Sequence, residues 1–224
     1  MTQIQTKTKL LFFFCCCLMF SAFAQNRMSP IDKANFKTIA LSKDQSGSLI
    51  IKKWVVPVRY KIYSAKEAYF STEIDSIFAQ IKALTGLDIA PAKNDDEVNF
   101  SVFLGGKTDF GNQIPTVAMQ NFSSYGGTYY KFNGKGEIYQ GIDLITVASF
   151  TDQRDVRNAL RKSIVKLFGF FNPLENTPNS IFYSQSNNVV KFDSYDSVLI
   201  RLLYSPRFTP GMNLPQVDEV LGKI

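Results

Sequence analysis

No histidine occurs among the 224 residues of this chain, and its only cysteines are the adjacent Cys15, Cys16 and Cys17. Without imidazole, the chain cannot build a Ser-His-Asp or Cys-His catalytic device, nor a metal site with histidine ligands. Hydrophobic residues make up 45% of the sequence and charged residues 20%, which is the composition of a globular protein. The fold must therefore depend on buried apolar side chains.

The N-terminal segment has the pattern of a secretory signal peptide. Lys7 and Lys9 form a basic start, and from Leu10 to Phe20 the cysteines are the only interruption of an apolar run. Ala22-Phe23-Ala24 is a small-x-small cleavage signature. These features predict a signal peptide over residues 1–24, cleaved after Ala24, and an exported protein in the periplasm or outside the cell.

Cleavage would change the composition of the chain. The apolar run ending at Ala24 is shorter than the roughly 20 residues that span a bilayer, so we expect no integral membrane span in the mature protein. Lipidation would need a small residue before the modified cysteine, whereas Cys15 follows Phe14. The mature chain would contain no cysteine and hence no disulfide, and its net charge would fall from +6 to +4. This modest charge does not indicate a nucleic-acid partner.

Short runs of alternating apolar residues predict strands. Val58, Tyr60 and Ile62 alternate with less apolar neighbours, and residues 98–104 alternate in the same way. Two further runs flank Asn133-Gly134-Lys135-Gly136 and predict a hairpin with a glycine-rich turn. Together these runs predict a mixed or antiparallel sheet.

Apolar residues at spacings of three and four predict helices. The first helix follows a capping-box pattern, Ser64-x-x-Glu67, and ends at Gly86, with its apolar stripe at Phe70, Ile74, Ile77, Phe78, Ile81 and Leu84. The second is capped by Thr151 or Asp152, and its stripe contains Val156, Leu160, Ile164, Leu167, Phe168 and Phe171.

Two shorter helices are predicted near the C-terminus. One covers residues 193–204, stops before Pro206, and has its apolar side at Val198, Leu199, Leu202 and Leu203. Pro215 opens a last short helix. Residues 25–48 are mixed and polar and predict a partly ordered lead-in. We therefore expect one α+β domain over residues 49–224, with an N-terminal helix, a sheet and C-terminal helices.

The second helix invites comparison with a zinc-peptidase helix, in which His-Glu-x-x-His places two ligands on one face. Aligning the glycine that often follows that motif with Gly169 puts Lys162 and Lys166 at the ligand positions and Ser163 at the general base. Asn172 then falls at the third ligand of the longer motif. A protonated lysine repels Zn²⁺ and serine is a poor base, so we expect no metal and no cofactor.

The C-terminal third resembles a family of exported proteins known as domain of unknown function 2927. Leu167-Phe168-Gly169-Phe170 with Asn172, and Ser180-Ile181-Phe182, match the first two parts of its pattern. The third part, from Arg201 to Met212, contributes Arg201, Tyr204, Pro206, Arg207, Pro210, Gly211 and Met212. The resemblance implies a single zincin-like α+β domain whose metal motif has decayed. Members often have acidic and glutamine side chains on this helix, where the present chain has lysines and Ser163.

Two further features of the second helix allow other interpretations. Ser163-x-x-Lys166 matches the Ser-x-x-Lys of penicillin-binding proteins, although the accompanying Lys-Thr-Gly is missing. A carboxylate pair that meets only in space would be another catalytic device. Arg154, Arg157 and Arg161, with the two lysines, predict a basic face that is either simply solvated or a patch for an acidic partner.

These observations predict a binding or structural module without catalysis. A peptide along a sheet edge, a glycan or an envelope protein would be its partner. The alternative is a metal-independent hydrolase that uses Ser163 and Lys166, or a carboxylate pair. Arg207 is expected to hold the C-terminal loop by bonding to backbone carbonyl groups.

Overall fold

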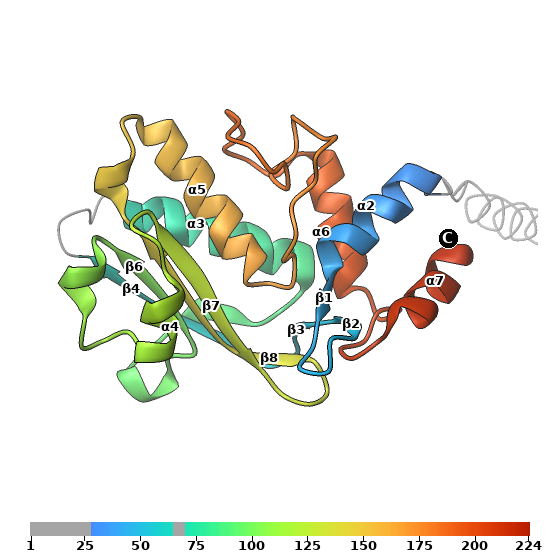
Figure 1. Cartoon of the computed structure of the whole chain (residues 1–224), viewed down its shortest axis with the longest axis horizontal. Coiled ribbons are helices and arrows are strands. Elements are labelled where there is room, and N and C mark those ends of the chain that lie inside the picture. The colour runs from blue at the N-terminus through green and yellow to red at the C-terminus, as the bar shows by residue number, and fades with distance from the viewer. Residues whose placement is uncertain (1–27, 65–69) are drawn as a thin grey trace, which may run out of the picture.

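The computed structural model describes residues 28–64 and 70–224 (Figure 1). The predicted signal peptide, and Glu67 of the predicted capping box, lie outside the described residues. Within the described part of the chain, no helix combines the length and the apolar character needed to cross a membrane.

The main sheet contains β3 (Lys53–Trp54), β4 (Val58–Ser64), β5 (Ile89–Pro91), β6 (Phe100–Leu104), β7 (Gly126–Phe132) and β8 (Glu137–Ile145). The strands β3, β8, β6, β4 and β5 pair in parallel, and β7 pairs antiparallel with β8. A separate antiparallel pair is formed by β1 (Leu41–Lys43) and β2 (Leu49–Ile51).

The sheet is thus mostly parallel, and the expected antiparallel character is limited to the β7–β8 hairpin and the small β1–β2 pair. Alternation within one strand does not tell its direction relative to its neighbours, which depends on the connections. Here α3 (Ser71–Thr85) connects β4 to β5, and a helical crossover of this length allows the two strands to run in parallel. The fold is a mixed α/β arrangement.

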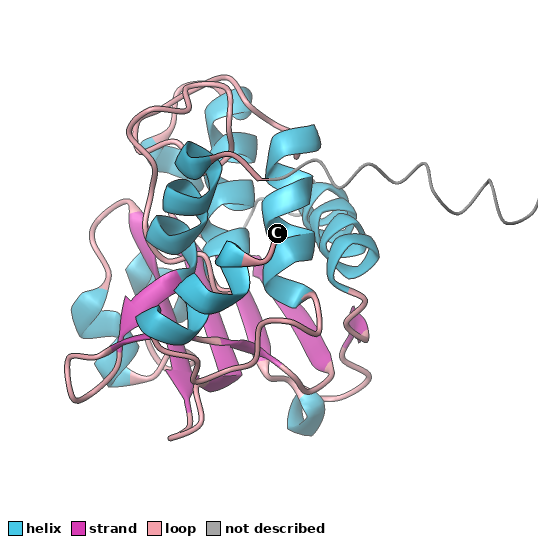
Figure 2. Ribbon diagram, turned by 90° about the vertical axis from the view of Figure 1, so that its right-hand side faces the viewer, coloured by secondary structure: helices cyan, strands magenta, loops and turns pink. Residues whose placement is uncertain are grey.

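The other helices are α2 (Pro30–Ala40), α4 (Thr116–Asn121), α5 (Gln153–Lys166), α6 (Ser194–Tyr204) and α7 (Leu214–Gly222). Figure 2 shows most of the helices gathered on one side of the sheet. The larger core lies on that side and includes Phe100, Val102 and Leu104 of β6, whereas Phe103 points into a smaller cluster with Phe122. Alternate residues of β6 therefore serve opposite faces of the sheet.

Aromatic side chains join the sheet to its helices. Phe168, just after α5, stacks on Phe100 of β6 with ring centroids 5.6 Å apart, and Phe78 of α3 meets Phe100 edge-on at 5.1 Å. The indole Nε1 of Trp54 donates to the Leu167 carbonyl oxygen at 2.9 Å. Aromatic contacts of this kind stabilise a fold beyond the area that they bury.

Several predicted helix ends are confirmed. Asp152 caps α5 by accepting from the backbone N–H of Arg154 at 2.7 Å, and Gly86 ends α3 with φ 72°. Pro215 lies in the first turn of α7, behind a capping box formed by Asn213 and Gln216.

The segment expected to be a lead-in is instead part of the domain. Ser29 caps α2 and Pro30 occupies its first turn, while Phe36, Ile39 and Ala40 are buried in the core. The ring of Phe36 lies 4.8 Å from that of Phe208 in the C-terminal segment. The missed signal was the spacing of these three apolar residues behind a Ser-Pro helix start, within an otherwise polar stretch.

The apolar side of α6 also differs from the expected one. Leu199, Ile200 and Leu203 are buried, but Val198 is 55% exposed and Leu202 is half-buried. The helix has two apolar faces, one in the core and the other towards a cavity. A simple apolar stripe does not distinguish these two environments.

The hairpin turn between β7 and β8 generates a stability prediction. Gly136 has φ 79°, and a Cβ there would lie 2.7 Å from the Ile51 carbonyl oxygen and the Gly211 amide nitrogen, whereas a Cβ on Gly134 would meet nothing within 4 Å. We expect Gly136→Ala to lower the free energy of unfolding by about 2 kcal/mol or more, and Gly134→Ala to change it by less than about 1 kcal/mol. Urea denaturation measures both, and equal effects would contradict this explanation.

Candidate functional site

The motif positions on α5 point in different directions. Ser163 faces the sheet, and its Oγ donates to Oδ2 of Asp143 on β8 at 2.6 Å. Asp143 is fully buried, and its Oδ1 has no hydrogen-bond partner among the described residues. Burial raises the pKa of this carboxyl to about 7, although the Ser163 hydrogen bond and the charge of Lys166 act in the opposite direction.

Among the described residues, neither lysine at the ligand positions forms a hydrogen bond or ion pair with Asp143, although the charge of Lys166 acts on its carboxyl. Lys162 Nζ donates to the carbonyl oxygens of Tyr183 at 2.9 Å and Gln185 at 2.7 Å, and burial lowers its pKa. Lys166 is exposed. Both border a cavity of about 180 Å³ that does not include Ser163. The lysines therefore brace a loop and contact solvent, and the three α5 positions do not converge on one point.

Asn172 has a structural role at the end of α2. Its Nδ2 donates to the carbonyl oxygens of Thr38 at 2.9 Å and Leu41 at 2.8 Å. These carbonyl groups lie at the transition from α2 to β1, where helix carbonyls lose their intrahelical partners. Among residues 28–64 and 70–224, no group of three or more Asp, Glu, His or Cys side chains is placed to hold a metal ion.

The predicted basic face of α5 is only partly correct. Arg154 and Arg157 are exposed, but Arg161 is 1% exposed and donates from Nη1 to Oε1 of Glu73 at 3.0 Å and to the Val190 carbonyl oxygen. A buried guanidinium needs such partners to offset its desolvation. Arg161 therefore joins α5 to α3 and to the loop before α6.

A carboxylate pair is found at the start of α6, where it has a capping role. Asp193 and Asp196 form a capping box, and Asp196 also accepts from Ser180 Oγ at 2.5 Å and from the Ile181 amide at 3.1 Å. Burial raises the pKa of Asp196 above its ordinary value. Each carboxylate is committed to backbone or hydroxyl donors that order this part of the chain.

The residues of the C-terminal signature attach the end of the chain to the sheet. The hydroxyl of Tyr204 is buried and donates to the Phe168 carbonyl oxygen at 2.9 Å. Burial raises the pKa of this hydroxyl. The Gly211 amide donates to the Ile51 carbonyl oxygen at 2.9 Å, and the Ile51 amide donates to the Met212 carbonyl oxygen at 2.9 Å. Gly211 has φ 83°, which favours glycine.

Arg207 does not hold the C-terminal loop. The Nζ of Lys53 does so, by donating to the carbonyl oxygens of Leu203 at 3.0 Å and of Phe208, and burial lowers the pKa of this ammonium to about 8. Arg201, Pro206 and Arg207 are exposed. The expectation for Arg207 was wrong because the neighbouring strand β3 supplies a donor from inside the protein.

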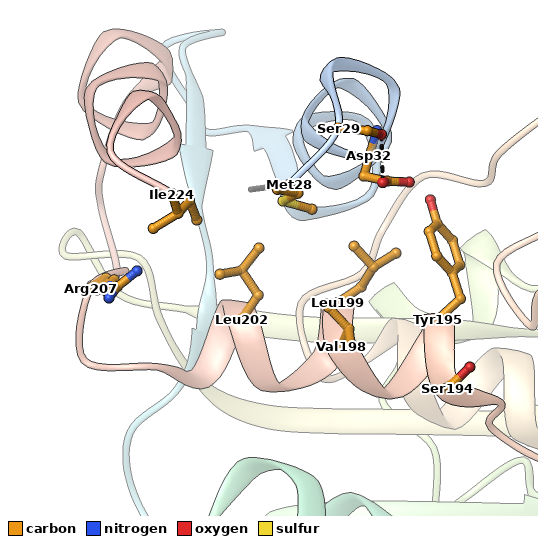
Figure 3. Close-up of a pocket in the computed structure, with 10 residues that line it drawn as sticks. All are labelled: Met28, Ser29, Asp32, Ser194, Tyr195, Val198, Leu199, Leu202, Arg207 and Ile224. Atoms are coloured by element: carbon orange, nitrogen blue, oxygen red, sulfur yellow. Dashed lines mark hydrogen bonds between the residues drawn. The ribbon is translucent and has the colours of Figure 1, made fainter. Parts of the chain in front are cut away.

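A cavity of about 620 Å³ lies between α2 and α6 (Figure 3). Its walls are mainly apolar, and its polar groups lie towards two ends. It is lined by Met28, Ser29, Asp32, Ser194, Tyr195, Val198, Leu199, Leu202, Arg207 and Ile224. Ligand pockets of proteins have this size and character. The cavity was not predicted from the sequence, because one of its walls comes from the segment expected to be a lead-in. The signal present in the sequence was the pair Val198 and Leu202, one helical turn apart.

The comparison with protein families identifies the chain. A family model described as protein of unknown function (DUF2927) matches residues 31–223. The chain belongs to this family. The match begins in α2 and ends just after α7, so α2 and α6, the helices on either side of the cavity, fall within the matched region. No curated protein matches the sequence significantly.

The buried carboxyl of Asp143 generates a prediction about pH. Its folded-state pKa of about 7 exceeds the 3.8 of an unperturbed aspartate, so the folded protein holds this proton more tightly than the unfolded chain. The resulting stabilisation is complete below about pH 4 and is lost as the pH rises to about 7.

Asp143→Asn cannot ionise but can still accept from Ser163. The difference in unfolding free energy between the variant and the original protein should therefore shift in favour of the variant by a few kcal/mol between pH 4 and 7. Urea denaturation of both proteins across this range is the measurement. Parallel stability curves would show that Asp143 ionises normally.

Proposed function

We propose that this protein is exported and acts by binding, as a zincin-like domain that has lost its catalytic metal. The observation that carries this proposal is that polar side chains at the motif positions, on α5 and shortly after it, already have partners within the protein. Ser163 bonds to Asp143, Lys162 to two loop carbonyl groups, and Asn172 to the end of α2. These contacts stabilise the fold, and ammonium groups at the ligand positions would repel a metal ion.

The zincin-like arrangement is supported by the position of α5. This helix packs against β7 and β8, the antiparallel pair at one side of an otherwise parallel sheet (Figure 1). It ends shortly before Gly169, whose φ is 104°, and Asn172 follows three residues later. Fold-level likeness does not assign an activity, so the binding role rests on the side chains.

The cavity between α2 and α6 supplies a more definite place for binding than the sheet edge. It is an open hollow of about 620 Å³ with mainly apolar walls, whereas an edge strand offers mainly backbone groups. A peptide, a glycan or a segment of an envelope protein remains the class of partner that we propose.

Hydrolysis is the second candidate function, because Ser163 and Asp143 lie in hydrogen-bond contact. A carboxylate with a pKa of about 7 could take the proton of Ser163 as its Oγ attacks a carbonyl carbon. Against this, Asp143 is fully buried, and the ammonium of Lys166 is exposed to solvent on α5.

A fluorophosphonate probe tests the two candidates. If the protein acts by binding, the probe should leave Ser163 unlabelled under conditions that label a known serine hydrolase, because the Oγ faces the sheet. The purified protein should likewise leave a peptide library intact, with or without a chelator. Labelling that disappears in Ser163→Ala would establish the hydrolase, and chelator-sensitive cleavage would show that a metal enzyme remains.

Export has its own test. We expect the protein recovered from the exported fraction of expressing cells to begin at Gln25, as determined by N-terminal sequencing. Replacing Ala22 and Ala24 by bulky residues should block cleavage, because the processing site accepts small residues at these positions. Recovery of the intact chain, starting at Met1, from the cytoplasm would contradict the proposed export.

A further inference from the structure

The cavity between α2 and α6 has an apolar middle. Figure 3 shows Val198, Leu199 and Leu202 projecting from α6 towards Met28, while Ile224 approaches from the C-terminal side. Val198 is 55% exposed although it is apolar, and it lies on the opposite side of α6 from the buried Ile200. An apolar ligand segment would cover these side chains and remove them from water.

One end of the cavity is acidic. The carboxylate of Asp32 accepts from Ser29 Oγ at 2.5 Å, and no cationic side chain of the described residues forms an ion pair with it. The Tyr195 hydroxyl points towards this carboxylate in Figure 3 and is oriented by a hydrogen bond from Asn35 Nδ2 at 2.8 Å. This end would therefore suit a cationic group that can donate hydrogen bonds.

The other end is basic. Arg207 is exposed, and within residues 28–64 and 70–224 its guanidinium takes part in no ion pair or hydrogen bond. Its backbone is nevertheless fixed, because Phe208 is buried against Phe36 and its carbonyl oxygen accepts from Lys53. An arginine on a well-anchored backbone, with its donors free, suits a carboxylate, which it can bind through two parallel hydrogen bonds.

The length of the apolar floor limits the length of the ligand. Tyr195 and Leu202 are seven residues apart on α6, which corresponds to about 10 Å along the helix axis at roughly 1.5 Å per residue. An extended peptide advances roughly 3.3 Å per residue, so about three residues cover this floor. The volume of about 620 Å³ lies within the usual range of ligand pockets.

We propose that this cavity binds short unmodified peptides of about three or four residues with apolar side chains, the terminal ammonium at Asp32 and the terminal carboxylate at Arg207. The proposal rests on the binding role proposed above and names its ligand. A fatty acid would match Arg207 and the apolar floor but would place a hydrocarbon end against Asp32. A cationic amphiphile would match Asp32 and the apolar floor but would place its hydrocarbon end against Arg207.

Isothermal titration calorimetry with trileucine tests the proposal on the purified exported protein. We expect one saturable site. Acetylation of the amino end or amidation of the carboxyl end should each weaken binding by about two- to fivefold, as expected for partly exposed charge pairs. Laurate, an anion with an apolar tail, should bind more weakly than trileucine because it cannot pair with Asp32.

Variants with matched controls test which residues bind the two ends of the peptide and which contact its apolar side chains. Arg207→Gln should abolish the preference for trileucine over its amide, whereas Arg201→Gln, exposed but outside the cavity, should preserve it. Asp32→Asn should abolish the preference for the free amino end. Val198→Trp should fill the cavity and weaken binding at least tenfold, while Val117→Trp, at a similarly exposed valine of α4, should not.

The outcomes separate this proposal from the proposed function. Equal binding of blocked and free peptides, tighter binding of laurate, or unchanged binding by Val198→Trp would overturn the peptide site. If trileucine is neither bound nor cleaved, the proposed peptide site is also overturned, but the proposed non-catalytic role is not. Trileucine that is bound in the cavity and then cleaved would support the site and overturn the non-catalytic role.

Discussion

The end of the chain depends on one short buried segment, Ile50–Trp54. Ile51 exchanges backbone hydrogen bonds with Gly211 and Met212, and the indole of Trp54 donates to the carbonyl oxygen of Leu167. The ammonium of Lys53 bridges the carbonyl oxygen of Leu203, in the last turn of α6, and that of Phe208, in the loop after α6. A buried ammonium is stable only when its desolvation is offset by such acceptors. Since no disulfide is available to the described residues, this small set of directional bonds positions α6, α7 and the turn after α5.

The family signature acquires a physical meaning from this arrangement. The hydroxyl of Tyr204 donates to the carbonyl oxygen of Phe168 and accepts from the Trp54 amide at 3.4 Å. Tyr204 therefore connects α6 to the turn after α5 and to the segment 50–54. Gly211 comes so close to the hairpin turn that a Cβ there would lie 2.8 Å from the Lys135 carbonyl oxygen. These residues are constrained by packing and backbone geometry. Arg201 and Arg207, both exposed in the same stretch, have guanidinium groups with no such structural task among the described residues, and of these two Arg207 is the one that lines the cavity.

The sequence allowed the local elements to be predicted better than their arrangement. The stripe from Phe70 to Leu84, the Asp152 cap and the glycine-rich hairpin follow from periodicity and turn chemistry, and all three are present. The parallel pairing of β6 with β4 and β8 depends on crossovers that no single strand encodes. The cavity could not be predicted either, because it needs Asp32 and Tyr195 to meet across about 160 residues of chain.

The buried polar groups between α5 and its neighbours differ from the exposed polar groups of the cavity in what they leave available to a ligand. Asp143 and Arg161 are buried ionisable groups whose loss of hydration must be offset inside the protein, and their partners, Ser163 and Glu73, come from the protein itself. Asp32 and Arg207 lie at a boundary with water, so neither needs a protein counter-ion to be stable there. A ligand that pairs with them meets a small desolvation penalty and gains an apolar floor. Specific recognition is therefore physically easier at this boundary than at α5, whose buried polar side chains already have partners within the protein.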